Sequence, residues 1–334
     1  MNINRFVAVF KARNIEFFRD RAALSWNLIF PVLLLVGFSF IFSGDGRATF
    51  KIGVIDLPTQ SAPFLQIKHI EFVNYQKLEQ AQLKLSQHSI DLLIDFSEHR
   101  YWVNEQSANS YLVEKIFLAT QSGFQRLVMQ GKQIRYVDWV LPGILAMNMM
   151  FSSLFGVGYV IVRYRKNSVL KRLKATPLSA FEFISAQVLS RLFIVMFMSS
   201  VVYIGCNFLF HFYMLGSYFN LLLVGLLGSF CLICLGLLIA SRSKSEELVG
   251  GLLNLISWPM MMLSGVWFSL EGAPSWLKTA AEFLPLTHIV TAARQIITEG
   301  ATLSQISYHL TVLSIMSAVF LLAGSYLFSW NTER

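Results

Sequence analysis

Long stretches without a charged side chain dominate the sequence. Five of them contain no Asp, Glu, Lys or Arg: Leu24–Phe42, Val140–Val162, Leu192–Ala240, Leu248–Leu270 and Leu303–Asn331. A helix needs about 20 apolar residues to cross a bilayer, so four of the stretches fit one crossing each. The stretch Leu192–Ala240 is too long for one helix, and we expect a break within it at His211–Tyr218. The pattern predicts six membrane-spanning helices, at about 24–42, 140–162, 183–210, 218–240, 248–270 and 304–330.

Residues 44–137, between the first two predicted crossings, have a different composition. They carry 10 Lys and Arg residues and 9 Asp and Glu residues, a balance typical of a soluble domain. The pattern predicts strands at Lys51–Asp56, Glu71–Asn74, Ile90–Phe96 and Arg100–Asn104, and helices at Tyr75–Ser86 and Ser107–Gln130. Strands that alternate with helices indicate a small extracytoplasmic α/β domain at 43–138. Asp91 and Asp95 alternate with apolar residues, so we expect them on a solvated strand face.

The first 23 residues are basic and amphipathic. Ile3, Phe6, Val7 and Phe10 follow helical spacing, while the basic residues lie away from that stripe. Such a helix lies in the plane of the membrane interface, where its apolar face is buried and anionic headgroups attract its cations. The segment 1–23 is predicted to be an interfacial elbow helix, with an ordinary signal-anchor flank as the alternative. The apolar run that follows exceeds the core of a cleavable signal peptide, so we expect it to be retained.

The net charge of +8 suggests nucleic-acid binding, but the placement of the charges favours membrane topology instead. Of the 17 Lys and Arg residues outside 44–137, 14 fall on one side of the predicted crossings, two fall on the other, and Arg191 lies within the third crossing. Because Lys and Arg in short loops stay in the cytoplasm, both termini are predicted to be cytoplasmic. We expect a multi-pass protein of a bacterial inner (cell) membrane with no nucleic-acid partner.

The loop 163–180 is the largest predicted cytoplasmic loop, and it carries six of those basic residues. Val169, Leu170 and Leu173 lie at helical spacing within it, and Pro177 ends any helix just before that residue. The loop is therefore predicted to hold a short amphipathic helix parallel to the membrane. The alternative is a basic anchor that only determines topology.

The segment 271–303 is interrupted by Pro274 and Pro285 but keeps apolar residues at nearly helical spacing. Non-helical backbone at membrane depth must be covered by protein, so we expect short re-entrant helices in the outer leaflet. The three cysteines of the chain all fall inside predicted crossings without His, Asp or Glu nearby. Packing explains them better than metal binding or redox chemistry does.

Two sequence features combine several residue types in a characteristic order. The segment Gly250–Ile297 contains an Asn, a Pro, a Ser-Gly pair, a second Pro, a Trp-Leu pair, a Leu-Pro-Leu-Thr element and an Arg, in that order. These positions are Asn254, Pro259, Ser264, Gly265, Pro274, Trp276, Leu277, Leu284, Pro285, Leu286, Thr287 and Arg294. The loop Val169–Phe183 contains an Arg-Leu-x-x-Thr-Pro-Leu-Ser element at Arg172–Ser179. In both features the chain resembles the ABC-2 type transporter permeases, whose signature region and coupling helix have these patterns.

The resemblance covers the whole chain and implies the membrane half of an ATP-driven exporter of amphipathic or hydrophobic cargo, such as a drug, a lipid or a lipid-linked molecule. It implies three kinds of partner: a cytosolic ABC ATPase subunit, a second permease copy or paralogue, and membrane lipids. The ATPase would dock on Arg165, Lys166, Val169, Leu170, Lys171, Arg172, Leu173, Lys174, Thr176 and Pro177. A signature or gating role is implied for Asn254, Pro259, Ser264, Gly265, Pro274, Trp276, Pro285 and Arg294. Many relatives carry acidic residues before the coupling element, whereas Arg163–Lys174 has none, so partner pairing need not follow the usual charge pattern.

The sequence contains no Gly-x-x-x-x-Gly-Lys-Ser/Thr phosphate loop. We therefore expect the chain not to be an enzyme and to bind no cofactor or metal itself. ATP and Mg²⁺ are expected on the partner ATPase.

Few ionisable residues fall within the predicted crossings, although ion-coupled transporters usually bury such residues to carry the coupling ion. We expect Arg191 to extend toward the cytosolic headgroups or to make a polar packing contact, with contact to an anionic, lipid-like substrate as the functional alternative. His309 is expected near the outer interface. Met260 and Met261 are expected either to line an adaptable apolar path or to pack in the core. The alternative to a permease is a membrane sensor whose outer domain binds a ligand and whose basic loop recruits a partner.

Overall fold

The computed structural model describes residues 3–41, 50–55, 63–67, 70–131, 135–241, 243, 245–270 and 274–328. The chain forms two compact units. One consists of Met1–Ser39 together with Val137–Arg334, and we call it the helical unit. The other consists of Phe40–Tyr136, and we call it the inserted unit. Each unit is described by itself.

Ten helices make up the described part of the helical unit. They are α1 (Ile3–Arg19), α2 (Arg21–Ile41), α5 (Tyr136–Lys166), α6 (Val169–Lys174), α7 (Ala180–Phe210), α8 (Tyr218–Ala240), α9 (Glu246–Leu263), α10 (Ser275–Glu282), α11 (Pro285–Glu299) and α12 (Ser307–Leu327). Four of them, α5, α7, α8 and α12, are long and apolar enough to cross a membrane. The other two predicted crossings correspond to α2, which includes the shorter apolar stretch Asn27–Val36, and to α9, which begins with two Glu residues. The chain is therefore a multi-pass membrane protein.

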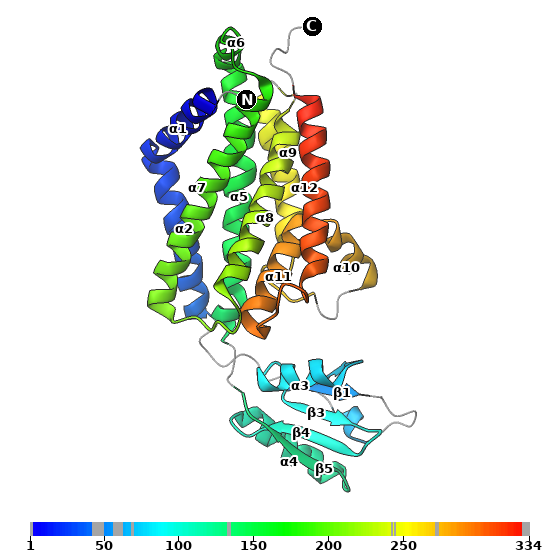
Figure 1. Ribbon diagram of the computed structural model, residues 1–334. Coiled ribbons are helices and arrows are strands. Elements are labelled where there is room, and N and C mark those ends of the chain that lie inside the picture. The colour runs from blue at the N-terminus through cyan, green and yellow to red at the C-terminus, as the bar shows by residue number, and fades with distance from the viewer. Residues whose placement is uncertain are drawn as a thin grey trace. The chain divides into compact units, whose positions relative to one another are not determined.

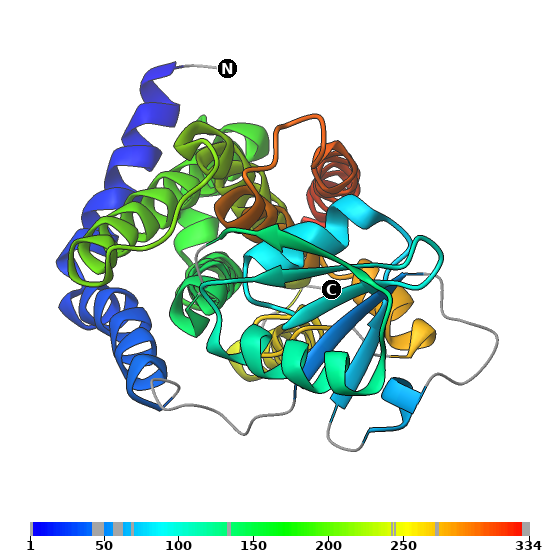
Figure 2. The ribbon, with the colours of Figure 1, turned by 90° about the horizontal axis from the view of Figure 1, so that it is seen from below.

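The helical unit has two distinct ends. Figure 1 shows α1 and α6 at one end and α10 and α11 at the other. The last turn of α2 and the first turn of α5 both lie at the α10–α11 end. Viewed end-on in Figure 2, α1 and α2 lie on one side of the unit and α12 lies on the opposite side. Helix α8 is central, because it packs against α7, α11 and α12.

Serine caps set the starts of α7 and α8. Ser179 begins α7 with a capping box: its hydroxyl accepts from the Glu182 backbone N–H at 3.2 Å, and the Glu182 carboxylate accepts from the Ser179 N–H at 3.0 Å. The helix ends where His211 adopts a left-handed φ of 49°. Ser217 then caps α8. The predicted break at His211–Tyr218 thus lies between α7 and α8.

The inserted unit has a five-stranded sheet among its described residues. Its elements are β1 (Phe50–Ile55), η1 (Pro63–Gln66), β2 (Ile70–Asn74), α3 (Leu78–Ser86), β3 (Leu92–Asp95), β4 (Arg100–Asn104), α4 (Ala108–Thr120) and β5 (Gln125–Met129). The strand order is β2-β1-β3-β4-β5, and only the β3–β4 pair is antiparallel. Successive side chains point to opposite faces of a sheet. Val54 therefore packs with Phe117 of α4, whereas Ile55 packs in a separate core with Leu85 of α3.

Two predictions for the inserted unit are wrong. The expected helix over Ser107–Gln130 ends at Thr120, and after Gly123 at a φ of 90° the chain forms β5, which pairs with β4. Helical periodicity alone does not predict β5, because this strand forms by pairing with β4, which lies before α4 in the chain.

Asp91 and Asp95 are buried rather than solvated. The Asp91 carboxylate accepts a hydrogen bond from the Lys51 N–H, and the Asp95 carboxylate accepts one from the Ser97 N–H, each at 2.9 Å. Burial raises the pKa of Asp91, and the Lys51 hydrogen bond opposes that shift. Asp91 precedes β3 and Asp95 is its last residue, so the two carboxylates accept hydrogen bonds from backbone N–H groups near the two ends of this strand.

Arg191 lies inside the helical unit, where it joins three helices. Its Nε donates to the Ser152 carbonyl of α5 at 2.8 Å, and its guanidinium also donates to the Ser152 hydroxyl at 3.0 Å. The guanidinium carbon lies 5.4 Å from the ring centre of Phe17 on α1. Gly156 leaves the necessary space, since a Cβ there would overlap the guanidinium. Of the expected roles of Arg191, the structure shows the polar packing contact and not the extension toward the headgroups, because α5 supplies its hydrogen-bond partners inside the unit.

Single cysteines at Asn109, Asn167 and Ser275 test the orientation of the chain, because all three positions are exposed. With the native cysteines replaced by Ser, the charge distribution predicts that Asn109→Cys and Ser275→Cys react with an impermeant maleimide added to intact spheroplasts. Asn167→Cys should react only after permeabilisation. Labelling of Asn167→Cys from outside would contradict the six-crossing arrangement.

Gly156→Val should destabilise the helical unit. The new side chain would displace the Arg191 guanidinium and leave a buried charge without partners, which costs on the order of 3–5 kcal/mol. We expect a lower melting temperature in mild detergent, measured by size-exclusion chromatography after heating. Gly205→Val on α7 is the matched control, because nothing lies within 4 Å of a Cβ added there. Equal melting temperatures for the two variants would contradict this role of Arg191.

Candidate functional site

The coupling segment, residues 163–180, presents a basic face outward. Ser168 adopts a left-handed φ of 59° and turns the chain from α5 into α6. Leu170 is fully buried and Leu173 partly buried in the core of the helical unit. Several predicted docking residues are exposed: Lys166, Lys171, Arg172, Lys174, Thr176 and Pro177. Leu170, predicted to anchor a partner, instead holds α6 on its own chain.

Arg165 connects the coupling segment to the turn between α8 and α9. The side chain is 8% exposed. Its guanidinium donates to the carbonyls of Ala240 at 3.1 Å and Ser241 at 2.8 Å, and also to the Ser243 carbonyl. Next to it, the Lys166 ammonium lies 3.9 Å from the Glu246 carboxylate of α9. Arg165 is therefore a brace within the helical unit rather than part of an outward docking face.

Helix α1 contacts residues on both sides of α6. Arg13 forms an ion pair with Glu16 at 2.6 Å and donates to the Tyr164 hydroxyl at 3.2 Å. The Tyr164 hydroxyl in turn donates to Glu16 at 2.6 Å. Beyond α6, the Pro177 carbonyl accepts a hydrogen bond from Arg5. The coupling segment is thus held between α1 and the α8–α9 turn.

At the opposite end, part of the predicted signature region forms a cluster around Arg294. Its guanidinium donates to the Gly265 carbonyl at 3.0 Å and to the Trp139 carbonyl at 3.3 Å, and it lies 3.8 Å from the Trp139 ring centre. Thr287 donates to the Ser264 hydroxyl at 3.0 Å. Gly265 adopts a φ of 70°, which favours glycine. The cluster therefore joins the end of α9 to α5 and α11.

The other signature residues lie apart from this cluster. Asn254 and Pro259 are on an exposed face of α9, and the Asn254 side chain donates to the Gly250 carbonyl of the same helix at 2.9 Å. Pro274 precedes α10, and Trp276 is 69% exposed. Pro285 is the first residue of α11, where its missing N–H removes no helical hydrogen bond.

A pocket of about 390 Å³ lies between α5, α7, α8 and α11 of the helical unit. Most of its lining is apolar, and its polar lining residues are Ser199, Ser200, Tyr203, Asn207 and Tyr218. The Tyr203 and Tyr218 rings meet edge to face, with centres 6.2 Å apart. No Asp, Glu, Lys or Arg of the described chain lines the pocket. An apolar wall with a few polar groups is typical of small-molecule sites.

The residues predicted to contact substrate do not line this pocket. Met260 and Met261 are buried in the core, and Arg191 bonds to Ser152. Met149 and Met196 line the pocket instead. Tyr203, Asn207 and Tyr218 are not predicted as pocket residues from the sequence. The one sequence feature that points to them is the group of hydroxyl and amide side chains on both sides of the break at His211–Tyr218.

His309 of α12 contacts His288 of α11. Their Nδ1 atoms are 2.9 Å apart, and the His288 Nε2 donates to the Glu282 carbonyl at 2.8 Å. Since that bond uses the Nε2 proton of His288, a neutral His288 accepts from the His309 Nδ1–H. Among the described residues, no group of three or more His, Cys, Asp or Glu is placed to hold a metal ion.

Comparison with known proteins identifies a family. The sequence profile described as ABC-2 family transporter protein matches residues 21–326. The chain is 21% identical over 354 residues to ABC transporter G family member 20 of Dictyostelium discoideum, covering 93% of this chain and 48% of that protein. It is 23% identical over 187 residues to the probable multidrug ABC transporter permease YbhR of Escherichia coli K12, covering 55% of this chain and 50% of the relative.

A third relative is the linearmycin resistance permease protein LnrN of Bacillus subtilis 168, 26% identical over 180 residues, which covers 52% of this chain and 44% of that protein. The chain thus spans about half the length of the relatives that it matches. The family profile matches most of the chain, including the coupling segment, the Arg294 cluster and the pocket. The chain therefore belongs to the ABC-2 family of transporter proteins.

Proposed function

We propose that this chain is the permease subunit of an ATP-driven exporter that moves amphipathic or hydrophobic cargo out of the cytoplasm or the inner leaflet. A separate cytosolic ABC ATPase binds ATP and Mg²⁺, and a second permease copy or paralogue completes the transporter. The chain crosses a bacterial inner membrane six times, with both termini in the cytoplasm. The inserted unit is an extracytoplasmic α/β domain. The names of relatives support permease function, since YbhR and LnrN are both described as permeases.

The topology agrees with the two ends of the helical unit. The basic segments α1 and α6 share one end, and α10, α11, the last turn of α2 and the first turn of α5 share the other. Lys and Arg near the ends of membrane helices favour the cytoplasm, so the α1–α6 end faces the ATPase in this proposal. Helices α2 and α9 complete the six crossings.

The outward basic face of α6 is the observation that carries the proposal. This helix is attached to the helical unit by Leu170, and Arg165 and Lys166 link its base to the α8–α9 turn. A force applied to α6 by an ATPase would therefore reach α8 and α9 directly. Lys171, Arg172 and Lys174 remain at the surface for electrostatic complementarity with a partner.

The pocket favours amphipathic cargo. Its four helices bring together an apolar wall and a cluster of hydroxyl and amide groups, without a charged side chain among the described lining residues. An apolar molecule with one uncharged polar group matches both parts. A small hydrophilic solute such as a free sugar would leave most of the wall unmatched.

Charge reversal on α6 should weaken ATPase docking. The triple variant Lys171→Glu/Arg172→Glu/Lys174→Glu would replace attraction by repulsion at the partner surface, and we expect at least about a tenfold loss of co-purified ATPase. The assay is a pull-down of tagged permease followed by immunoblotting, with membrane expression measured in parallel. Leu173→Asp is less informative, because Leu173 packs against its own chain and its loss also loosens α6.

The matched control reverses the charge of three exposed lysines elsewhere in the chain, as Lys77→Glu/Lys115→Glu/Lys278→Glu. This control should retain the ATPase. If the α6 variant also retains normal ATPase binding and transport, the coupling segment is only a topology anchor.

Filling the pocket should impair transport. Ser200→Trp places a large side chain in the pocket, and we expect efflux of a lipophilic dye to fall about tenfold in cells that express the permease and its ATPase. Val201→Trp is the control, because Val201 is 41% exposed and does not line the pocket. Equal efflux by the two variants, or robust transport of a free sugar by the native protein, would contradict the cargo assignment.

A further inference from the structure

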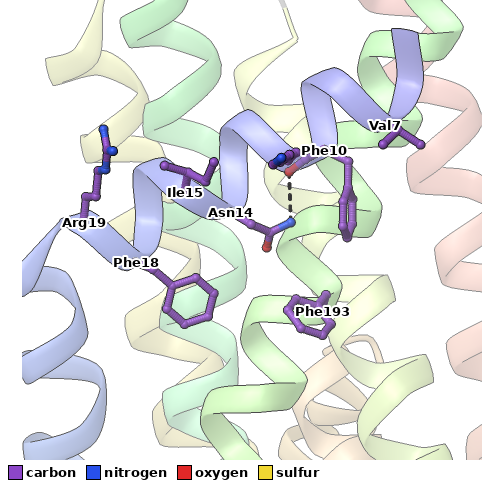
Figure 3. Close-up of a pocket in the computed structure, with 8 residues that line it drawn as sticks. Val7, Phe10, Asn14, Ile15, Phe18, Arg19 and Phe193 are labelled. Atoms are coloured by element: carbon purple, nitrogen blue, oxygen red, sulfur yellow. Dashed lines mark hydrogen bonds between the residues drawn. The ribbon is translucent and has the colours of Figure 1, made fainter. Parts of the chain in front are cut away.

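A groove lies between α1 and α7 at the end of the helical unit that carries α6. Its volume is about 520 Å³. Phe10 and Phe18 of α1 and Phe193 of α7 form its apolar surface, as Figure 3 shows. The ring centres of Phe10 and Phe193 are 6.3 Å apart, so the two helices meet at one corner of the groove. Phe18 and Phe193 remain 40% and 50% exposed, which leaves aromatic surface for an apolar occupant.

One uncharged polar side chain, Asn14, lines the groove, and its Oδ1 is buried without a hydrogen-bond partner among the described residues. The Asn14 amide donates to the Phe10 carbonyl of its own helix at 2.9 Å. The groove also continues into the exposed apolar face of α7, where Leu189, Phe193 and Phe197 are 46%, 50% and 45% exposed. Since α7 is long and apolar enough to cross a membrane, this face is where acyl chains would lie.

Two cations border this apolar groove. Val7, Lys11, Ile15 and Arg19 follow one another at four-residue steps, so apolar and basic side chains alternate along one face of α1. Lys11 and Arg19 are eight residues apart, about 12 Å along the helix, which lets both long side chains approach one phosphate. In Figure 3, Arg19 projects to the opposite side of α1 from Phe18.

These two cations differ from their neighbour on the same helix. Arg13 is paired with Glu16. Lys11 and Arg19 are exposed and have no acidic or hydrogen-bonding partner within the described residues. A cationic border above an apolar groove is complementary to an anion that carries a hydrocarbon chain.

We propose that this groove is a specific site for one anionic glycerophospholipid of the surrounding leaflet. Its phosphate lies between Lys11 and Arg19, and one acyl chain runs past Phe10, Phe18 and Phe193. The lipid would hold α1 against α7. Because α1 contacts Tyr164 and Pro177 on either side of α6, a lipid in the groove would stabilise the position of the coupling segment. This site is separate from the cargo pocket and does not depend on the transported molecule.

The test measures lipid retention by the full chain in mild detergent. Delipidated protein is mixed with dioleoylphosphatidylglycerol or dioleoylphosphatidylcholine, and bound lipids are counted by native mass spectrometry. We expect one phosphatidylglycerol per chain, retained about tenfold more strongly than phosphatidylcholine. Lys11→Gln/Arg19→Gln should remove this preference and leave phosphatidylcholine binding unchanged. Lys278→Gln on α10 is a control for loss of positive charge and should retain the preference.

A second variant separates the groove from simple surface attraction. Val7→Trp fills the groove but keeps both cations, and it should also abolish tight phosphatidylglycerol retention. Size-exclusion profiles verify that each variant is folded. Equal retention of the two lipids by the native protein would overturn the proposal. So would undiminished phosphatidylglycerol binding by the double Gln variant or by Val7→Trp.

Discussion

A buried guanidinium holds the helical unit together at its interior. Arg191 is surrounded by apolar helices, so its charge requires hydrogen-bond acceptors from the protein itself. Ser152 supplies them through its carbonyl and hydroxyl oxygens, and Gly156 supplies the space. The Phe17 ring completes the site and brings α1 into it. This contact is therefore part of the packing of α1 on α7. The position of the coupling segment and the groove between α1 and α7 both depend on that packing.

The same chemistry recurs at both ends of the unit. Arg165 donates to carbonyls at the end of α8, and Arg294 donates to the carbonyls of Gly265 and Trp139. Acidic side chains are scarce in this unit, whereas the last turns of α8 and α9 and the turns after them have carbonyls without intrahelical partners. A guanidinium has five donors in a rigid fork, so one side chain can join two or three segments. Hydrogen bonds from arginine to backbone carbonyls thus connect the segments of this unit, as ion pairs do in more charged proteins.

The pocket and the groove described above differ in charge and therefore in the ligand that we propose for each. The pocket between α5, α7, α8 and α11 offers hydroxyl and amide groups beside apolar walls, which match an uncharged amphiphile. The groove beneath α1 offers Lys11 and Arg19, which match a phosphate. A lipid that stabilises α1 would act on the coupling segment, whereas a molecule in the pocket would act on α5, α7, α8 and α11. Regulation by the membrane and recognition of cargo would then use separate surfaces.

Much of this organisation follows from the sequence alone. Charge-free runs of about 20 residues predict membrane helices because the bilayer excludes charge, and the break at His211–Tyr218 is visible as a local change of pattern. The family motifs also identify Ser264, Gly265 and Arg294, which the fold brings together. Partners distant in the chain are decided only by tertiary structure. Periodicity does not reveal that β5 pairs with β4, that Leu170 faces its own core, or that Arg191 turns inward to Ser152, because each depends on which atoms another segment places nearby.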